Sequence, residues 1–195
     1  MIRFKEIIDF IENNNKSLNK ESLVIVRKGD KFGFIRSYVS QLNVEGYYDY
    51  YINGEQVFKD YKHGDVSGFW VDYQGDLLNY SELSDDVKKK VRIDGDYRSV
   101  NSNMSFDSLD SMFMTVEKYK KLNTKSISNF KEDSEVVCIG FDDVLGHTVE
   151  SIELQENLLF DYNDSYGHDT KVQYKYPCVV LILGDEITNT FNSEK

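Results

Sequence analysis

The sequence is poor in several residues that shape or cross-link a chain: it has no alanine, one proline, one tryptophan and two cysteines. It also has no apolar run that approaches the ~18–20 residues needed to cross a bilayer. Residues 1–10 place charges inside their apolar pattern, which is not the pattern of a signal peptide. These absences predict a cytoplasmic protein without membrane contact.

The two cysteines, Cys138 and Cys178, each lie inside a run of apolar residues. In a reducing compartment such residues are small core side chains, and a disulfide between them would need an oxidising location. Apolar neighbours also raise the pKa of a thiol and limit access to it, which argues against Cys138 as a nucleophile. We expect two core thiols.

Sequence motifs that define a catalytic or metal site are missing as well. The chain has no CxxC, HExxH, GxSxG or Walker A sequence, and no GxGxxG after a strand. The three histidines, His63, His147 and His168, are too few and too scattered for a zinc signature. We therefore expect neither a metal nor a cofactor.

The acidic segment 161–172 begins like a calcium-binding loop. Asp161, Asn163 and Ser165 stand at its positions 1, 3 and 5, but glycine falls at position 7 and Val172 stands where a bidentate glutamate is required. The match to an EF-hand fails, and we expect a solvated acidic loop.

Charge is present in excess and is unevenly distributed. The formal net charge is −11, and residues 131–195 alone carry four Lys and Arg against fourteen Asp and Glu, a net −10. Residues 1–40 carry eight Lys and Arg against five Asp and Glu, a net +3. An acidic surface repels phosphate backbones and lipid headgroups and attracts a basic protein, so no direct nucleic-acid binding is expected.

Aromatic residues are also abundant, with 14 Tyr and 12 Phe in 195 residues. The abundance of Asn, Lys, Tyr, Ile and Asp indicates an AT-rich coding sequence, as in low-GC bacteria and their phages. Tyrosine supplies a large, rigid contact area, and carboxylates pair with Arg and Lys. Together they are typical of proteins that neutralise nucleases and other enzymes with basic clefts.

The run Cys178–Leu183 is the longest unbroken apolar stretch and predicts a central strand covered on both faces. Residues 135–141 are predicted to be its neighbour. Period-2 patterns and turn residues predict the remaining strands. These are expected at 22–27, 32–39, 46–52, 55–60, 66–73, 77–80, 148–154, 158–162 and 172–183, with turns that include Asn53-Gly54 and Gln74-Gly75-Asp76.

Helices are predicted at residues 3–15 and 107–121 from apolar spacings of three and four, with a minor helix at 85–92 capped by Ser84. The predicted fold class is α+β, with a mainly antiparallel, hairpin-built sheet flanked by two or three helices. We expect a single α+β domain over residues 1–195, with two lobes at 1–93 and 94–185 as the alternative. Residues 186–195 are predicted to be a loose tail.

The leading functional hypothesis is a non-enzymatic acidic interaction protein. It would act as an inhibitor of the immunity, antitoxin or anti-defence type by binding a basic, nucleic-acid-acting protein. The candidate partner-binding residues combine a tyrosine-rich strand with acidic turns. They are Tyr47, Asp49, Tyr51, Asp142, Asp143, Asp161, Asp164 and Asp169.

Two alternatives belong to other functional classes. A small metal-dependent or His/Asp hydrolase would use His147, His168 and nearby aspartates, and requires these side chains to converge in one concave site. A structural or assembly component would form homo-oligomers. The sequence leaves the oligomeric state open.

Overall fold

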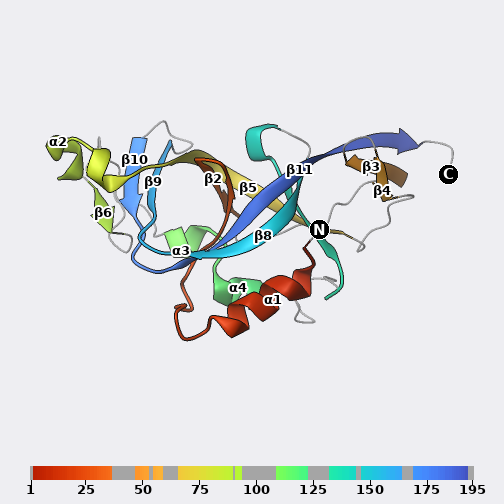
Figure 1. Cartoon of the computed structure of the whole chain (residues 1–195), viewed down its shortest axis with the longest axis horizontal. Helices are drawn as coiled ribbons and strands as arrows, with labels where there is room; N and C mark the ends of the chain where they lie inside the picture. The colour runs from red at the N-terminus through yellow and green to blue at the C-terminus, as the bar shows by residue number, and fades with distance from the viewer. Residues whose placement is uncertain are drawn as a thin grey trace.

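The structure is a computed structural model that describes residues 2–36, 47–52, 55–58, 66–89, 91–93, 109–122, 132–143, 146–163 and 169–192. These residues form one large mixed sheet of eleven strands with short helices packed against it (Figure 1). In this part of the chain, no helix is both long and apolar enough to cross a membrane.

The secondary-structure elements are as follows. The helices are α1 (Phe4–Asn13), α2 (Asp85–Lys88), α3 (Leu109–Met112) and α4 (Val116–Lys121), and the 3-10 turns are η1 (Tyr80–Glu82) and η2 (Phe141–Asp143). The first six strands are β1 (Val24–Lys28), β2 (Lys31–Ile35), β3 (Tyr47–Ile52), β4 (Glu55–Phe58), β5 (Val66–Leu77) and β6 (Arg92–Ile93). The others are β7 (Glu135–Ile139), β8 (His147–Gln155), β9 (Leu159–Asn163), β10 (Asp169–Gln173) and β11 (Cys178–Asn192).

Strand β11 is the centre of the sheet, as the sequence predicts. Its first half pairs in parallel with β1, where Val26 lies opposite Leu181, and antiparallel with β8 on its other side. Residues Cys178–Leu181 are fully buried, because both faces of this part of the sheet are covered. The predicted neighbour, β7, is not adjacent: β8 lies between it and β11.

Six strands close into a ring in the order β2-β1-β11-β8-β7-β5, because β5 also pairs back to β2. Strand β5 is twelve residues long, so Val66–Trp70 can pair with β7 while Val71–Asp76 pair with β2. The interior of the ring is the larger of two apolar clusters, to which α1 and α4 contribute. Its members include Phe4, Ile7, Ile11, Val24, Val26, Phe69, Val71, Tyr119, Val136, Cys138, Val149, Val179 and Leu181.

The second apolar cluster lies on the other face of β1, β2 and β11. The hairpin of β9 and β10 and helix α3 cover this face. Aromatic rings dominate it: Phe34 stacks on Phe113 with centroids 4.5 Å apart and meets the edge of Phe160 at 5.1 Å. Such ring pairs favour a fixed geometry. The sheet is packed on both faces, by the interior cluster on one and by this aromatic cluster on the other.

The prediction of a mainly antiparallel, hairpin-built sheet flanked by helices is wrong. The sheet is mixed: β1–β11, β5–β7 and β6–β10 are parallel pairs. Parallel strands cannot be joined by a tight hairpin, and their partners lie far apart in the sequence. Period-2 patterning marks which segments are strands but does not say which strand lies beside which.

Two local predictions are also wrong. No turn occurs at Gln74–Asp76, because β5 runs through it; Tyr73, with φ +48°, takes up the register shift opposite β2. The predicted helix 107–121 is interrupted, and Phe113 and Thr115 form β-bridges with Arg36 and Leu23. The ammonium of Lys118 donates to carbonyl oxygens of residues 110, 111 and 113 at this break.

Other predicted elements are confirmed. The helix at 3–15 is α1, and the predicted hairpin is formed by β1 and β2, with Gly29 at φ +62° in its turn. Residues 37–39 of its predicted second strand lie outside the described residues. The turn Asn53-Gly54 and the loop 94–105 lie outside the described residues. Residues 186–192, predicted to be part of a loose tail, belong to β11, whose last six residues pair with β3.

Candidate functional site

Helix α1 separates an apolar face from an acidic one. Phe4, Ile7 and Ile11 are at most 1% exposed and face the interior of the ring, whereas Glu6, Asp9 and Glu12 face outward. The backbone N–H of Arg3 donates to Oε2 of Glu6 at 2.7 Å, which stabilises the start of the helix. A helix built this way presents its carboxylates to solvent along its whole length.

The position of α1 is fixed by backbone pairing at its N-terminal end. The N–H groups of Phe4 and Lys5 donate to the carbonyls of Ser134 and Glu132, each at 2.9 Å. The Tyr119 hydroxyl donates to the Phe4 carbonyl at 3.1 Å, and the two rings stack with centroids 4.8 Å apart. These contacts attach the start of the helix to residues 132–134 and to the buried Tyr119.

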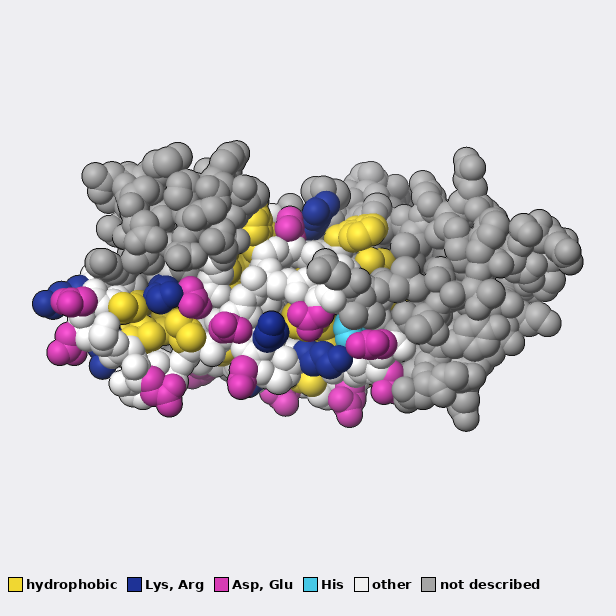
Figure 2. All heavy atoms as spheres, turned by 90° about the horizontal axis from the view of Figure 1, so that it is seen from above, with side chains coloured by type: hydrophobic (Ala, Val, Ile, Leu, Met, Phe, Trp, Pro, Cys, Tyr) yellow, Lys and Arg dark blue, Asp and Glu magenta, His cyan; other side chains and the backbone are white. Residues whose placement is uncertain are grey.

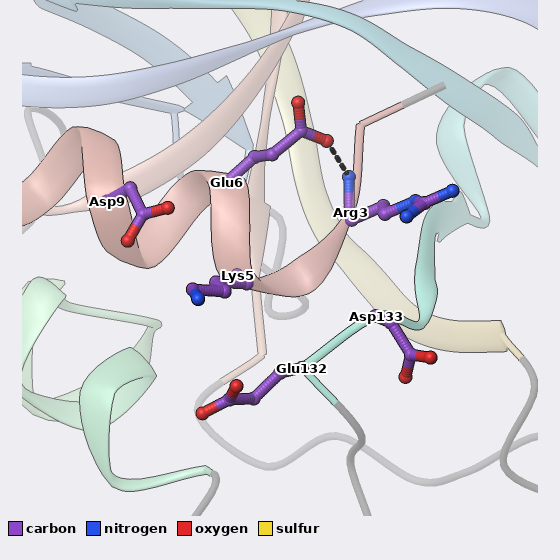
Figure 3. Close-up of a pocket in the computed structure, with 6 residues that line it drawn as sticks. All are labelled: Arg3, Lys5, Glu6, Asp9, Glu132 and Asp133. Atoms are coloured by element: carbon purple, nitrogen blue, oxygen red, sulfur yellow. Dashed lines mark hydrogen bonds between the residues drawn. The ribbon is translucent and has the colours of Figure 1, made fainter.

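A hollow of about 620 Å³ lies between the first turns of α1 and the segment before β7 (Figure 3). Four carboxylates and two cations line it. They belong to Arg3, Lys5, Glu6, Asp9, Glu132 and Asp133. The mixture of signs leaves this hollow with a net formal charge of −2.

A second hollow, about 480 Å³, lies between α1 and β8, and we call it the α1–β8 groove. Its lining residues are Ile2, Glu6, Asp9, Phe10, Asn13, Glu150, Ser151 and Ile152. Ile2, Phe10 and Ile152 are partly buried and pack against the interior cluster, so they form an apolar floor. The three carboxylates form the charged part of the lining, and none of its residues is a lysine or an arginine.

Ion pairs offset part of the acidic charge around α1. Lys120 Nζ lies 2.9 Å from Oε1 of Glu12, and Arg3 Nε lies 3.8 Å from Oε1 of Glu135. Within the described part of the chain, Asp9 and Glu150 take part in no ion pair. These two carboxylates, both exposed, are therefore available to an external cation.

The side of the molecule away from α1 has a different character. Seen from above, its described side chains mix Lys and Arg with Asp and Glu around small apolar patches (Figure 2). The electrostatic potentials of neighbouring charges of opposite sign largely cancel at points farther from the surface than the Debye length, which is about 8 Å in physiological salt. The α1–β8 groove differs because its lining carries only one sign.

The structure separates the partner-binding residues that the sequence predicts. Tyr47, Asp49 and Tyr51 lie in β3, which pairs with β4 and the end of β11, whereas Asp161 lies in β9 at the opposite end of the molecule (Figure 1). Asp161 accepts a 2.8 Å ion-paired hydrogen bond from Lys171.

The remaining predicted residues lie elsewhere. Asp142 is exposed in η2 with φ +51°, and its N–H donates to Gln74 Oε1 at 2.8 Å. For Asp143, in η2, and for Asp169, the first residue of β10, the structure describes the backbone. Asp164 lies outside the described residues. The described members of the set thus do not form one surface.

His147, the residue proposed for a hydrolase, is packed in the protein interior. It is 0% exposed, its Nδ1 lies 3.2 Å from the Gly184 carbonyl oxygen, and the edge of its ring meets Phe141. His168 lies outside the described residues. Over the ranges that the structure describes, no group of three His, Cys, Asp or Glu side chains is arranged to hold a metal ion.

Both cysteines are free and buried, as predicted. Burial raises the pKa of the Cys138 thiol to about 12 from an ordinary value of 9.0. Burial also raises the pKa of Tyr119 well above 10.0, and the neighbouring Cys138 adds to that shift. Neither group is ionised at neutral pH, so both are structural.

The raised Cys138 pKa predicts a loss of stability in alkali. The unfolded chain releases the thiol proton above about pH 9, whereas the folded protein retains it up to about pH 12, so stability falls as pH rises through this window. Between pH 9 and about pH 10.5 this group alone should cost roughly 2 kcal/mol. Urea unfolding at several pH values measures the slope. An equally steep slope in Cys138→Ala would contradict this assignment.

Sequence reasoning missed the α1–β8 groove. Residues 1–40 sum to +3, and this total conceals the acidic outer face of α1 within them. A helical projection of residues 4–13 alone would have revealed the face, because Glu6, Asp9 and Glu12 follow the i, i+3 spacing. Nothing in the sequence indicates that Glu150 lies across the groove from them.

Comparisons with known proteins give no family for this chain. No protein-family model matches it, and neither the curated proteins nor the solved structures gave a match.

Proposed function

We propose that the protein is a non-enzymatic acidic interaction protein that inhibits a basic, nucleic-acid-acting protein by covering its basic surface. The observation that supports this most is the acidic surface around α1. There, Asp9 and Glu150 line a hollow with no cation in its lining and form no ion pair within the described residues. Nucleic-acid-acting proteins carry basic surfaces because they must bind phosphates.

Electrostatics would act on such a complex in two ways. The formal net charge of −11 draws a basic partner and speeds its encounter with the protein. The carboxylates around α1 would then pair with its Arg and Lys and fix the orientation. The same charge repels nucleic acid and anionic membranes, so the proposed partner is a protein, and the proposed location is the cytoplasm.

The proposal assigns the protein to the immunity, antitoxin or anti-defence type of inhibitor. An inhibitor of this type needs rigid contact residues, because ordering a flexible surface on binding costs free energy. The backbone bonds from Phe4 and Lys5 to residues 134 and 132 supply that rigidity around α1. The tyrosine-rich strand β3 remains a predicted second contact.

A pull-down tests this proposal. Tagged protein is incubated with lysate of the source cell or its host and washed at low and at high salt, and retained proteins are identified by mass spectrometry. We expect one basic nucleic-acid-acting protein in stoichiometric amount, weakened by salt because the contact is ionic. The protein should also inhibit that partner's activity at equimolar concentration. Retention of no basic protein, or of one whose activity is unchanged, would contradict the proposal.

A further inference from the structure

We infer that the α1–β8 groove receives an amphipathic basic segment of the partner, with an apolar side chain on the groove floor and Lys or Arg beside it. This inference rests on the proposed function and names the chemistry of the segment that the partner presents. Two features of the groove, its floor and its charged lining, support it.

The floor can hold an apolar side chain. Ile2, Phe10 and Ile152 are only partly buried, and each packs against the interior cluster. Their position is therefore fixed before any partner binds, and covering them removes apolar surface from water without reordering the protein. A partner segment made only of polar residues would leave the exposed parts of these three side chains without an apolar contact.

The carboxylates can hold cations on both sides of that side chain. Glu6 and Asp9 are three residues apart on α1, so they lie on one face of the helix, and Glu150 belongs to β8 on the other side of the groove. Cationic side chains on both flanks of an apolar residue match this arrangement. The long apolar stems of Lys and Arg add contact with the floor.

The neighbouring hollow between α1 and the segment before β7 is a poorer site for the same segment. Arg3 and Lys5 are among its lining residues and would repel an incoming Arg or Lys. The hollow between α1 and α4, about 210 Å³, includes Lys120 paired with Glu12. Of the hollows around α1 that the described residues form, the α1–β8 groove alone combines an apolar floor with a lining that contains carboxylates and no Lys or Arg.

Fluorescence anisotropy with two labelled peptides tests the inference. The first peptide, about 12 residues of Leu and Lys, places leucines on one helical face, and in the second every Leu is replaced by Ser. At low salt the wild-type protein should bind the first peptide at least about fivefold more tightly than the second, because the second has no apolar side chain to cover the floor.

A pair of double variants separates the groove from overall charge. Asp9→Asn with Glu150→Gln should weaken binding of the first peptide about fivefold, since two exposed ion pairs together contribute about 0.4–2 kcal/mol. Asp30→Asn with Glu156→Gln changes the net charge equally at exposed sites outside the groove, and should change binding less than about twofold. Circular dichroism and thermal unfolding verify that both are folded.

A third variant blocks the groove directly. Asn13→Arg places a cation at an exposed position of the groove lining and should abolish measurable peptide binding, whereas Ser17→Arg, an exposed site outside the groove, should retain most of it. Equal weakening by both double variants, or retained binding in Asn13→Arg, would overturn the inference. If the pull-down partner still bound the groove variants as tightly as wild type, the inference would fail while the proposed function stood. Recovery of no basic partner would instead remove the proposed function.

Discussion

Replacement of Leu181 by alanine should lower the free energy of unfolding by about 3–4 kcal/mol, the range found for leucine truncations that leave a cavity in a packed core. Leu181 is 0% exposed, lies in β11 opposite Val26 of β1 and Ile152 of β8, and belongs to the interior cluster. The strands around it are joined in a closed ring and cannot move inward independently. The cavity should therefore persist rather than collapse.

The adjacent Ile182 provides the control. It lies on the other face of β11, is only partly buried, and packs at the edge of the second cluster. Ile182→Ala should cost about 1 kcal/mol, because it removes apolar contact without creating an enclosed void. Urea unfolding of both variants gives the comparison. Equal losses would contradict the assignment of the two residues to the inside and the outside of the ring.

Replacement of Gly75 by alanine should disrupt the pairing of β5 with β9 and cost about 3 kcal/mol or more. A Cβ atom at Gly75 would lie 1.9 Å from the carbonyl oxygen of Asp161, closer than any van der Waals contact allows. Because the obstructing atom belongs to the backbone of the paired strand, a rotamer change cannot relieve the clash. Strands β5 and β9 must therefore separate. Phe160 and Tyr162, which belong to β9 and to the second cluster, would move with it.

Gly29→Ala is the matched control for Gly75→Ala. A Cβ atom at Gly29 meets nothing within 4 Å, and the positive φ of +62° is its only cost, about 1 kcal/mol. Thermal and urea unfolding should rank the variants as wild type, Gly29→Ala, then Gly75→Ala. Hydrogen exchange of the β9 amides should rise selectively in Gly75→Ala, and unchanged protection there would refute the close approach of the two strands.

The sequence allowed local elements to be predicted well and their pairing poorly. The apolar spacing of Phe4, Ile7 and Ile11 is sufficient to identify α1, and the run at 178–183 identifies the central strand. The parallel pairing of β5 with β7 joins segments almost seventy residues apart in the chain. No local pattern encodes such a pairing, because it depends on which buried faces fit together.

Tertiary contacts also override local propensity. The spacing of Leu109, Met112 and Val116 predicts one continuous helix, yet Phe113 and Thr115 form isolated β-bridges with residues that flank β2 and β1. The break is stabilised by Lys118, whose ammonium donates to three carbonyls before it in the chain. Desolvation lowers the pKa of Lys118, although nearby carboxylates oppose the shift. The spacing of apolar residues along the sequence does not predict these tertiary contacts, so it does not predict the break in the helix.

The candidate site was predictable in character and not in position. The excess of carboxylates in residues 131–195 is visible in the sequence, and one of them, Glu150, lines the groove. The other two groove carboxylates, Glu6 and Asp9, come from the segment whose summed charge is positive. A net charge summed over residues 1–40 does not reveal that one face of α1 is acidic. Only the packing of α1 beside β8 brings Glu6 and Asp9 near Glu150.

The measurement that tests the account most directly is calorimetric titration of the partner recovered by pull-down. Wild type and the Asp30→Asn/Glu156→Gln variant should bind it with similar affinity at low salt, and the Asp9→Asn/Glu150→Gln variant about fivefold more weakly. Raising the salt concentration should weaken wild type more than the groove variant, because the groove variant has already lost its ionic contacts. Equal affinity of all three proteins, unchanged by salt, would contradict an acidic surface around α1 as the binding site.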